Sequence, residues 1–483
     1  MRRRVDDTAR AVEGDVIAGE PTRVWDGAAI DSRAVAGGEL FFALAGERTD
    51  GHRFLGDAFA RGAAAAVVDR ELPVAERGGA AACLLRVADT YAALHELTRT
   101  LRRDAPEVLV AVTGSAGKTT TKELLAAMCE RRFRTARNPG NLNNLYGFPV
   151  SLLSIPDVTE VMVAELGMSV AGELGAVSRL ARPDGVVLTN VRPVHLASFP
   201  DLAAIAEAKA EVFEGLAPSG FVAANRDDPE VERVTRRWQG ETGGRVVWFG
   251  SEGGETEVRA LDVRPIARPG EEGVASAVGS RFLLDLGGDA IEVELPLHGR
   301  HNVDNALAAA AAARELGVTG EEIREALAAA VPAAHRGAVH RLPEGVTLVD
   351  DSYNSNPDAL ARALAAAAEL AGDAAAGGGR RRRVAVLGDM LELGPEEDRF
   401  HREAGERAAR LGFSPLAGVG ELARGLAAAA REGGAEAVWL PDAEAATAWA
   451  EKNLRPGDLI LVKGSRGVGL EAVVERLLGR QNT

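Results

Sequence analysis

The chain has 483 residues, and at about 100 to 200 residues per domain this length predicts roughly three domains. Its formal net charge of −15 argues against a nucleic-acid-binding scaffold and favours small-molecule partners. No uninterrupted apolar run is long enough to span a membrane and no apolar signal segment follows residues 1–7, so we expect a cytoplasmic protein without membrane insertion. Cys83 and Cys129 lack metal-binding spacing, which fits a reducing compartment. We also expect the protein to be a monomer.

Residues 1–106 mix short apolar runs with polar turns, a pattern that predicts a small α/β domain. Two segments in it carry distinctive polar residues: Ile-Asp-Ser-Arg at 30–33, and 39–52, which ends in Asp-Gly-His.

Residues 108–120 carry the most specific local pattern, an apolar strand followed by a glycine loop and a helix. In such a loop, backbone N–H groups and the positive end of the helix face phosphates, Lys118 reaches the outer phosphates and Thr119 offers a hydroxyl to Mg²⁺. One departure is Val112, which stands where the common pattern has glycine. A purely structural glycine turn is the alternative, but the order of strand, loop, Lys-Thr and helix favours an ATP or GTP site.

Residues 107–332 as a whole alternate strands with helices, with strands expected at 108–112, 160–165 and 185–190 and helices at 119–131 and 201–216. This alternation is typical of a parallel sheet with crossover helices. Short alternating runs at about 240–297 predict a β-rich insertion.

Residues 333–483 repeat strand then helix five times, with strands expected near 346–349, 384–387, 416–419, 437–440 and 459–462. The repetition predicts a second doubly wound α/β domain. The Ala- and Gly-rich residues 374–379, followed by arginines at 380–383, are expected to form an exposed loop leading into a strand.

Side chains capable of chemistry follow the central strands at their carboxyl ends, where open α/β sheets bind ligands. Glu165 ends the strand 160–165 and would face the phosphate loop as a hard ligand for Mg²⁺, with a buried structural glutamate as the alternative. The next strand ends at Thr189 and Asn190, and His195 follows it as a candidate metal ligand or a structural histidine.

Lysine is rare in this arginine-rich chain, and its five occurrences are Lys118, Lys122, Lys209, Lys452 and Lys463. Lys122 and Lys452 are expected as solvated charges on helix surfaces. Lys209 instead lies by helical spacing on an apolar stripe formed by Leu202, Ile205, Val212, Phe213 and Leu216. Desolvation lowers a lysine pKa, and a neutral amine can take up CO₂ to form an anionic carbamate, which arginine cannot do. A lysine that extends past the helix edge to solvent is the alternative.

Taken together, the motifs resemble the Mur ligase family. They occur in the family's order at 113–120, 138–144, Glu165, Thr189-Asn190 with His195, 207–209, 298–302 and 350–357, and they cover nearly the whole chain. Segments 31–33, 41–52, 386–394 and 462–466 resemble the branch that adds a dipeptide, whereas the C-terminal region lacks the D-x-P-R-type motif typical of the third-residue ligases. The departures are Ser355 in place of the usual alanine, and Leu145-Tyr146 before Gly147.

The resemblance implies a three-domain α/β architecture, with an N-terminal UDP-substrate domain (1–106), a central P-loop parallel-sheet domain (107–332) and a C-terminal Rossmann-like domain (333–483). It also implies ATP-dependent joining of D-alanyl-D-alanine to UDP-N-acetylmuramoyl-tripeptide through an acyl phosphate, as a step of peptidoglycan precursor synthesis.

The resemblance further implies site residues. The ATP site would comprise Gly114, Ser115, Ala116, Gly117, Lys118, Thr119, Thr120, His301, Asn302, Arg336 and Asp351. Two Mg²⁺ ions would be held by Thr119, Glu165, His195 and carbamylated Lys209, and Lys118, Glu165, His195 and Lys209 would be the catalytic residues. Substrate contacts would come from Asp31, Ser32 and Arg33 for uridine, from Asn141, Asn144, Thr189 and Asn190, and from Tyr353, Asn354, Asn356, Lys463 and Arg466 for the dipeptide.

Two alternatives stay open at this point. One is another ligase of the same superfamily, such as the third-residue Mur ligase or a folylpolyglutamate synthase. The other is a non-catalytic ATP-dependent interaction protein, against which the intact set Lys118, Glu165, His195 and Lys209 argues.

Overall fold

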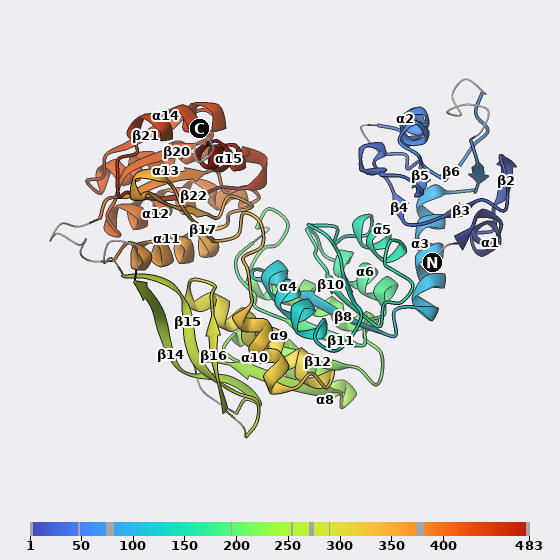
Figure 1. Ribbon diagram of the computed structural model, residues 1–483, viewed down its shortest axis with the longest axis horizontal. Helices are drawn as coiled ribbons and strands as arrows, with labels where there is room; N and C mark the ends of the chain where they lie inside the picture. The colour runs from blue at the N-terminus through green and yellow to red at the C-terminus, as the bar shows by residue number, and fades with distance from the viewer. Residues whose placement is uncertain are drawn as a thin grey trace.

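A computed structural model describes residues 3–46, 49–73, 82–194, 196–252, 255–269, 275–288, 290–372 and 381–479, with only the backbone described at 267–269 and 275–278. The chain forms three parts, each built around its own sheet. Figure 1 shows the N-terminal part in blue and the C-terminal part in orange to red on either side of the central sheet. Within the described ranges, no helix has the length and apolar character needed to cross a membrane.

The N-terminal part is a five-stranded sheet in the order β2-β7-β6-β5-β4, in which only the β2–β7 pair is antiparallel. Its strands are β2 (Asp15–Ala18), β4 (Ala28–Ala29), β5 (Leu40–Phe42), β6 (Ala65–Val68) and β7 (Leu84–Arg86), beside a two-stranded ribbon of β1 (Arg3–Arg4) and β3 (Val24–Trp25). Its helices are α1 (Val5–Ala11), α2 (Leu55–Ala60) and α3 (Thr90–Asp104).

Helix α3 attaches this part to the central one through a buried arginine. Arg102 donates hydrogen bonds to the backbone carbonyls of Pro106, Ala181 and Arg182, at 2.9, 2.8 and 3.0 Å, and to Oδ2 of Asp184 at 2.6 Å. Because these acceptors lie just before β8 and at or just after the end of α6, one side chain holds α3 against the central part.

The central part is a nine-stranded sheet in the order β16-β15-β14-β13-β12-β11-β8-β10-β9. Its strands are β8 (Val108–Thr113), β9 (Thr135–Arg137), β10 (Val161–Glu165), β11 (Gly185–Leu188), β12 (Phe221–Asn225), β13 (Arg245–Gly250), β14 (Val258–Pro269), β15 (Ala275–Asp285) and β16 (Ala290–Leu295). The pairs from β14 to β9 are parallel, and β15 and β16 continue the sheet in antiparallel fashion.

Both faces of the central sheet are covered at its inner strands β8, β10, β11 and β12, so these strands are almost entirely buried. Along β8, Leu109 and Ala111 face one core cluster, and Val110 and Val112 face the other. Helices α5 (Gly147–Leu153), α6 (Glu173–Ala181), α7 (Leu202–Ala210) and α8 (Pro229–Thr242) cover the first face, and α4 (Lys118–Cys129), α9 (Arg300–Glu315) and α10 (Gly320–Ala328) cover the second.

Three expectations for the central part are corrected. The helix expected over 201–216 ends at Ala210 and continues as a 3₁₀ segment, Glu211–Gly215. Leu202 does not join the buried stripe: it is 38% exposed, because it is the first helical residue and lies at the surface end of α7. Lys122 is not solvated but wholly buried, because residues 137–140 fold against its side of α4.

The C-terminal part is a six-stranded sheet in the order β17-β18-β22-β19-β20-β21, parallel except for β17 at the edge. Its strands are β17 (Ala338–Arg341), β18 (Thr347–Asp350), β19 (Arg383–Gly388), β20 (Phe413–Val419), β21 (Ala437–Leu440) and β22 (Leu459–Lys463). Helices α11 (Pro357–Ala371), α12 (Glu397–Arg410) and α13 (Ala423–Glu432) pack on one face, and α14 (Ala443–Asn453) and α15 (Glu471–Gly479) on the other. The mixed α/β fold class and the two-sided C-terminal sheet are confirmed.

The arginine run before β19 is corrected in part. The expected loop at 374–379 and the first arginine, Arg380, lie outside the described residues, but the arginines at 381–383 are not free solvated charges. Arg382 pairs with Asp458 at 2.7 Å, and Arg383 is buried at the start of β19, because their guanidinium groups satisfy carbonyls and carboxylates of neighbouring loops.

Candidate functional site

The phosphate loop begins two residues later than in the common pattern, at Gly114 instead of position 112, which accounts for the departure at Val112. That valine is buried inside β8 and pairs in register with Glu165 of β10. The loop proper starts at Gly114, whose φ is +146°, and ends at Gly117, which caps α4 with a φ of +80°.

Glycine is required at both ends of this loop. A Cβ atom on Gly114 would lie 2.0 Å from Oγ1 of Thr189, and one on Gly117 would lie 2.1 Å from Oδ1 of Asn305. Both positions also have the positive φ that other residues adopt only with strain.

The next strand end supports the loop from behind. Thr189 Oγ1 donates to the carbonyl of Ala116 at 2.8 Å, and Asn190 both accepts from the Ala116 N–H at 2.9 Å and donates to its carbonyl at 3.0 Å. Ser115 in turn holds the segment after β11, since its hydroxyl accepts from the N–H of Arg192 at 2.8 Å. Direct substrate contact by Thr189 and Asn190 stays a prediction.

Lys118 turns back over the loop that precedes it. Its ammonium donates to the Gly114 carbonyl at 2.9 Å. Burial lowers the pKa of Lys118, the Glu165 carboxylate opposes that shift, and Arg336 adds to it. The ammonium therefore lies beside the N-terminus of α4, where phosphate groups bind in loops of this kind.

Glu165 is 3% exposed and is held at both carboxylate oxygens. Thr119 Oγ1 donates to its Oε2 at 2.6 Å, and Asn143 Nδ2 donates to its Oε1 at 2.9 Å. A hydroxyl beside a fixed carboxylate is a donor set of hard oxygen atoms, which suits Mg²⁺ when phosphate oxygens and water complete the coordination.

Lys209, near the end of α7, lies close to Lys118 and Glu165. It is 3% exposed, and its pKa is lowered well below the ordinary value, mainly by desolvation and secondarily by the charge of Lys118. Among the described residues, its ammonium has no hydrogen-bonding or ion-pair partner. His195, the other expected ligand, lies outside the described residues.

A cavity of about 480 Å³ joins these groups with the C-terminal part. Of the residues expected from sequence, it is lined by Gly114, Ser115, Ala116, Gly117, Lys118, Thr119, Thr120, Asn141, Asn144, Glu165, Asn190, Lys209, His301, Asn302, Arg336, Asp351, Tyr353, Asn354, Asn356, Lys463 and Arg466. Asp31, Ser32 and Arg33 are not among its lining residues. They lie in the N-terminal part, where Arg33 pairs with Asp31 at 2.7 Å and points into solvent.

The C-terminal residues are connected to one another at the cavity. Lys463 Nζ donates to Oδ2 of Asp351 at 2.6 Å and to the carbonyl of Asn354 at 2.9 Å. The guanidinium carbons of Arg336 and Arg466 lie 4.0 and 5.5 Å from the ring centre of Tyr353. The cluster presents positive charge, amide groups and an aromatic ring to the phosphate loop.

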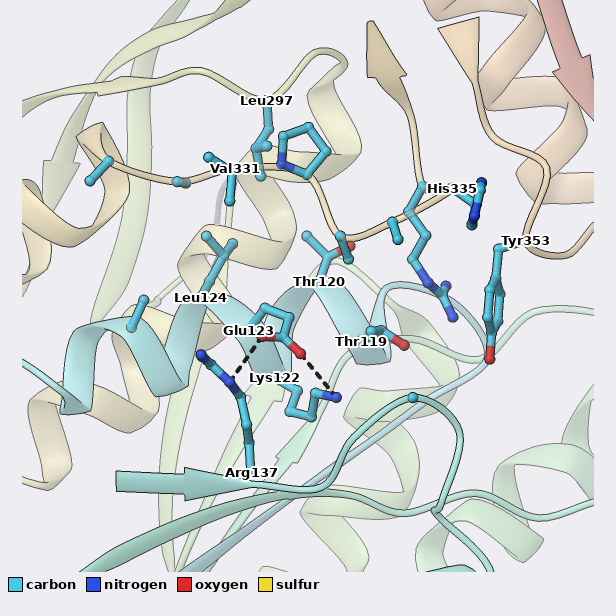
Figure 2. Close-up of a pocket in the computed structure, with 18 of the residues that line it drawn as sticks. Thr119, Thr120, Lys122, Glu123, Leu124, Arg137, Leu297, Val331, His335 and Tyr353 are labelled. Carbon is cyan, nitrogen blue, oxygen red and sulfur yellow. Dashed lines mark ion pairs between the residues drawn. The ribbon is translucent and has the colours of Figure 1, made fainter. Parts of the chain in front are cut away.

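A second cavity, of about 500 Å³, lies along the outer face of α4 (Figure 2). It shares Thr119, Thr120, Arg336 and Tyr353 with the first cavity, and residues 329–336 line its far side. Figure 2 also shows Lys122, Glu123 and Arg137 at its base, joined by ion pairs.

The residues that sequence reasoning missed at the site include Asn143, which holds Glu165, Asn305, which meets Gly117, and Lys122. For two of them the sequence carried a signal. Asn143 belongs to the asparagine run 138–144, and Asn305 follows Asn302 by one helical turn on the same face of α9.

The comparisons with known proteins agree with this architecture. Three family models match: the Mur ligase family catalytic domain at 26–130, the Mur ligase middle domain at 112–313, and the Mur ligase glutamate ligase domain at 335–466. Proteins named UDP-N-acetylmuramoyl-tripeptide--D-alanyl-D-alanine ligase are 34% identical in Escherichia coli K12, over 94% of this chain and 93% of the relative, and 31% identical in Bacillus subtilis 168, over 99% of both.

Solved structures are similar over the same extent. A crystal structure of MurF from Acinetobacter baumannii has a TM-score of 0.82 at 29% identity, covering 99% of both chains. A MurF ligase from Thermotoga maritima in complex with ADP has a TM-score of 0.76 at 26% identity, covering 95% of this chain and 98% of that one. The resemblance inferred from the sequence is confirmed, and the chain belongs to the Mur ligase family.

Proposed function

We propose that this chain is an ATP-dependent amide ligase that joins D-alanyl-D-alanine to the terminal carboxylate of UDP-N-acetylmuramoyl-tripeptide. The observation that carries the proposal is the cavity in which Lys118, Glu165 and Lys209 of the central part meet Lys463 and Arg466 of the C-terminal part. The names of the relatives supply the substrates. The domain boundaries near 106 and 332 remain part of this proposal.

The chemistry has two balanced steps. First, a carboxylate oxygen of the tripeptide attacks the γ-phosphorus of ATP, the bond to the β–γ bridging oxygen breaks, and ADP leaves. Second, the dipeptide amine attacks the acyl carbon, phosphate leaves from the tetrahedral intermediate, and the amine loses a proton. Both steps concentrate negative charge near the phosphoryl group, which the Lys118 ammonium would neutralise from the N-terminus of α4.

Thr119 and Glu165 would hold Mg²⁺, because their oxygen atoms are already adjacent and one carboxylate oxygen is fixed by Asn143. When bound, Mg²⁺ supplies charge neutralisation at the transferring phosphoryl group. His301, Asn302, Arg336 and Asp351 are proposed to complete the ATP site.

Lys209 is proposed to act as a carbamate. Burial lowers the pKa of Lys209 well below its ordinary value, which favours the neutral amine, and a neutral amine can add CO₂ to form N–COO⁻ with release of one proton. The resulting anion would lie near the Lys118 ammonium, and the carbamate and His195 would be ligands for a second Mg²⁺ that orients the tripeptide carboxylate.

The two substrates are proposed to approach from opposite parts. Asp31, Ser32 and Arg33 would contact uridine in the N-terminal part, and Asn141 and Asn144 would contact the muramoyl peptide beside the phosphate loop. Tyr353, Asn354, Asn356, Lys463 and Arg466 would form the dipeptide pocket. Lys463 and Arg466 would attract the free carboxylate of D-alanyl-D-alanine.

The test is phosphate release from ATP over a panel of acceptors and amines. We expect turnover only with UDP-N-acetylmuramoyl-tripeptide and D-alanyl-D-alanine together. Turnover with UDP-N-acetylmuramoyl-dipeptide and a single amino acid, or with a folate and glutamate, would replace the proposal with another ligase of the superfamily. If the tripeptide carboxylate is labelled with ¹⁸O, one label should appear in the released phosphate, and unlabelled phosphate would contradict the acyl-phosphate step.

A further inference from the structure

Lys122 is the most deeply buried charged side chain beside the site. Its relative exposure is 0%, although a lysine on an amphipathic helix usually reaches solvent. Its ammonium donates to the carbonyl of Asn138 at 2.7 Å and pairs with Oε1 of Glu123 at 3.0 Å. Figure 2 shows Glu123 between Lys122 and Arg137, with which it forms a second ion pair. The buried charge is therefore balanced, and its one backbone acceptor lies on the segment after β9.

Asn138, whose carbonyl accepts this hydrogen bond, connects two segments of the site. Asn138 is also 0% exposed, and its side chain bonds both backbone groups of Glu165: Oδ1 accepts from the N–H at 2.8 Å, and Nδ2 donates to the carbonyl at 2.9 Å. The same Nδ2 donates to the carbonyl of Leu142 at 2.8 Å. Asn138 thus connects the carboxyl end of β10 to the rest of the asparagine segment, residues 138–144. From the same segment, Asn143 donates to the Glu165 carboxylate.

These contacts form one continuous connection from α4 to the carboxylate. Lys122 lies one helical turn after Thr119, whose hydroxyl donates to the other oxygen of Glu165. Helix α4 therefore holds Glu165 in two ways. Thr119 donates directly to its carboxylate, and Lys122 acts indirectly by bonding Asn138, which bonds the Glu165 backbone. An apolar side chain would leave the Asn138 carbonyl without its buried donor, and the five N–H donors of arginine would need more acceptors than this space offers.

We propose that Lys122 is a positioning residue for Glu165, holding the asparagine segment so that both carboxylate oxygens are presented in the geometry that binds Mg²⁺. This inference rests on the proposed role of Glu165 as a Mg²⁺ ligand. It explains why lysine persists at this position in a chain that uses arginine for nearly all its other basic residues.

The experiment measures the Mg²⁺ requirement of Lys122→Met, which keeps the length of the side chain and removes the donor and the charge. Loss of a group that orients a metal ligand costs about 10- to 100-fold in metal affinity or activity, so the half-activating Mg²⁺ concentration should rise, and kcat should fall, by at least about tenfold. The KM for D-alanyl-D-alanine should stay within about twofold of wild type, because the dipeptide pocket is built by other residues. The matched control is Lys452→Met, since Lys452 is an exposed lysine on α14 and its loss should change neither quantity.

Asn138→Ala provides a second route to the same result. It should raise the Mg²⁺ requirement as Lys122→Met does, and the double variant should be no worse than the worse single one, because both break the same connection. If Lys122→Met does not fold, as judged by circular dichroism and thermal unfolding, Lys122→Gln replaces it. The glutamine amide retains a donor for the Asn138 carbonyl but lacks the charge and the full length of lysine. Complete loss of a group that orients a metal ligand costs roughly 10-fold or more, so for this partial loss we expect the Mg²⁺ requirement to rise by at least about threefold.

The outcomes separate this inference from the proposed function. A wild-type protein without ligase activity overturns the proposed function itself. An active wild type, with a Mg²⁺ requirement of the folded Lys122 variant within twofold of wild type, overturns the positioning role and leaves the ligase assignment standing. Additive effects of the Lys122 and Asn138 substitutions likewise overturn it, because independent effects would mean that Lys122 does not act through Asn138.

Discussion

Replacing Gly117 by alanine should weaken ATP binding far more than an ordinary glycine substitution. Gly117 has φ +80° and ψ −6° at the start of α4, and an added Cβ would lie 2.1 Å from Oδ1 of Asn305. Asn305 is 6% exposed and makes side-chain hydrogen bonds with Asn302 at 3.1 Å and Thr121 at 3.4 Å, so it cannot move without breaking them.

The cost can be summed from these contacts. Left-handed backbone in an alanine costs about 1 to 2 kcal/mol, and two lost hydrogen bonds add about 0.5 to 1.5 kcal/mol each, giving about 2 to 5 kcal/mol. The loop relieves this strain by leaving its phosphate-binding shape, and ATP must restore that shape to bind. Since 1.4 kcal/mol is a factor of ten, we expect the Kd for ATP to rise by at least about 25-fold, measured by calorimetry at saturating Mg²⁺.

Gly172 provides a closely matched control. It is also a glycine at the start of a helix, with φ +85° and ψ −22°, but a Cβ there would meet no atom within 4 Å. Gly172→Ala should therefore cost only the backbone strain, seen in thermal stability, and leave ATP affinity unchanged. The reasoning is refuted if Gly117→Ala binds ATP within threefold of wild type, or if adding Asn305→Ala does not reduce the effect of the Gly117 substitution.

Four further predictions follow from the same structure. Lys118→Ala should lower kcat by at least about a hundredfold in the phosphate-release assay, because no other described lysine donates to the loop, and near-normal turnover would contradict the phosphate-loop assignment. Lys209→Ala should lose most activity but keep its ATP affinity, and formate or acetate should restore part of the activity. Lys209→Arg should stay inactive because a guanidinium cannot take up CO₂. Normal turnover of the arginine variant would remove the carbamate from the mechanism. Arg102→Met should lower the free energy of unfolding in urea by about 2 to 3 kcal/mol, less than for a fully buried pair because the partner Asp184 is 36% exposed, and an unchanged midpoint would contradict the anchoring role of α3. Burial lowers the pKa of His301 to about 4 from the ordinary 6.5, so between pH 4 and pH 6.5 the folded state binds fewer protons than the unfolded state. The stability that depends on neutral His301 is complete above pH 6.5 and is lost as the pH falls towards 4. Acidification from pH 7 to pH 5 should therefore lower the free energy of unfolding of the wild type more than that of His301→Gln, as measured by urea titration.

The sequence by itself was sufficient for features whose causes are local. The phosphate loop could be recognised because strand, loop and helix are consecutive, and their geometry depends on neighbouring glycines and on the helix terminus. The strands of the parallel sheets could be located because burial on both faces makes them continuous apolar runs. Glu165 could be placed beside the loop because parallel strands deliver their carboxyl ends to one edge.

Tertiary structure decided which polar groups are enclosed. Lys122 reads as a solvated helix residue from its local pattern, yet the segment after β9 covers it, and nothing within α4 encodes that contact. Leu202 reads as part of an apolar stripe, yet it lies at the exposed beginning of α7. Asn305 contacts Gly117 although the two are 188 positions apart in the sequence, and Arg382 pairs with Asp458, which lies 76 positions away. Burial and ion pairing depend on which distant segments fold together, so a periodic pattern fixes the face of an element and leaves its partner to the assembled fold.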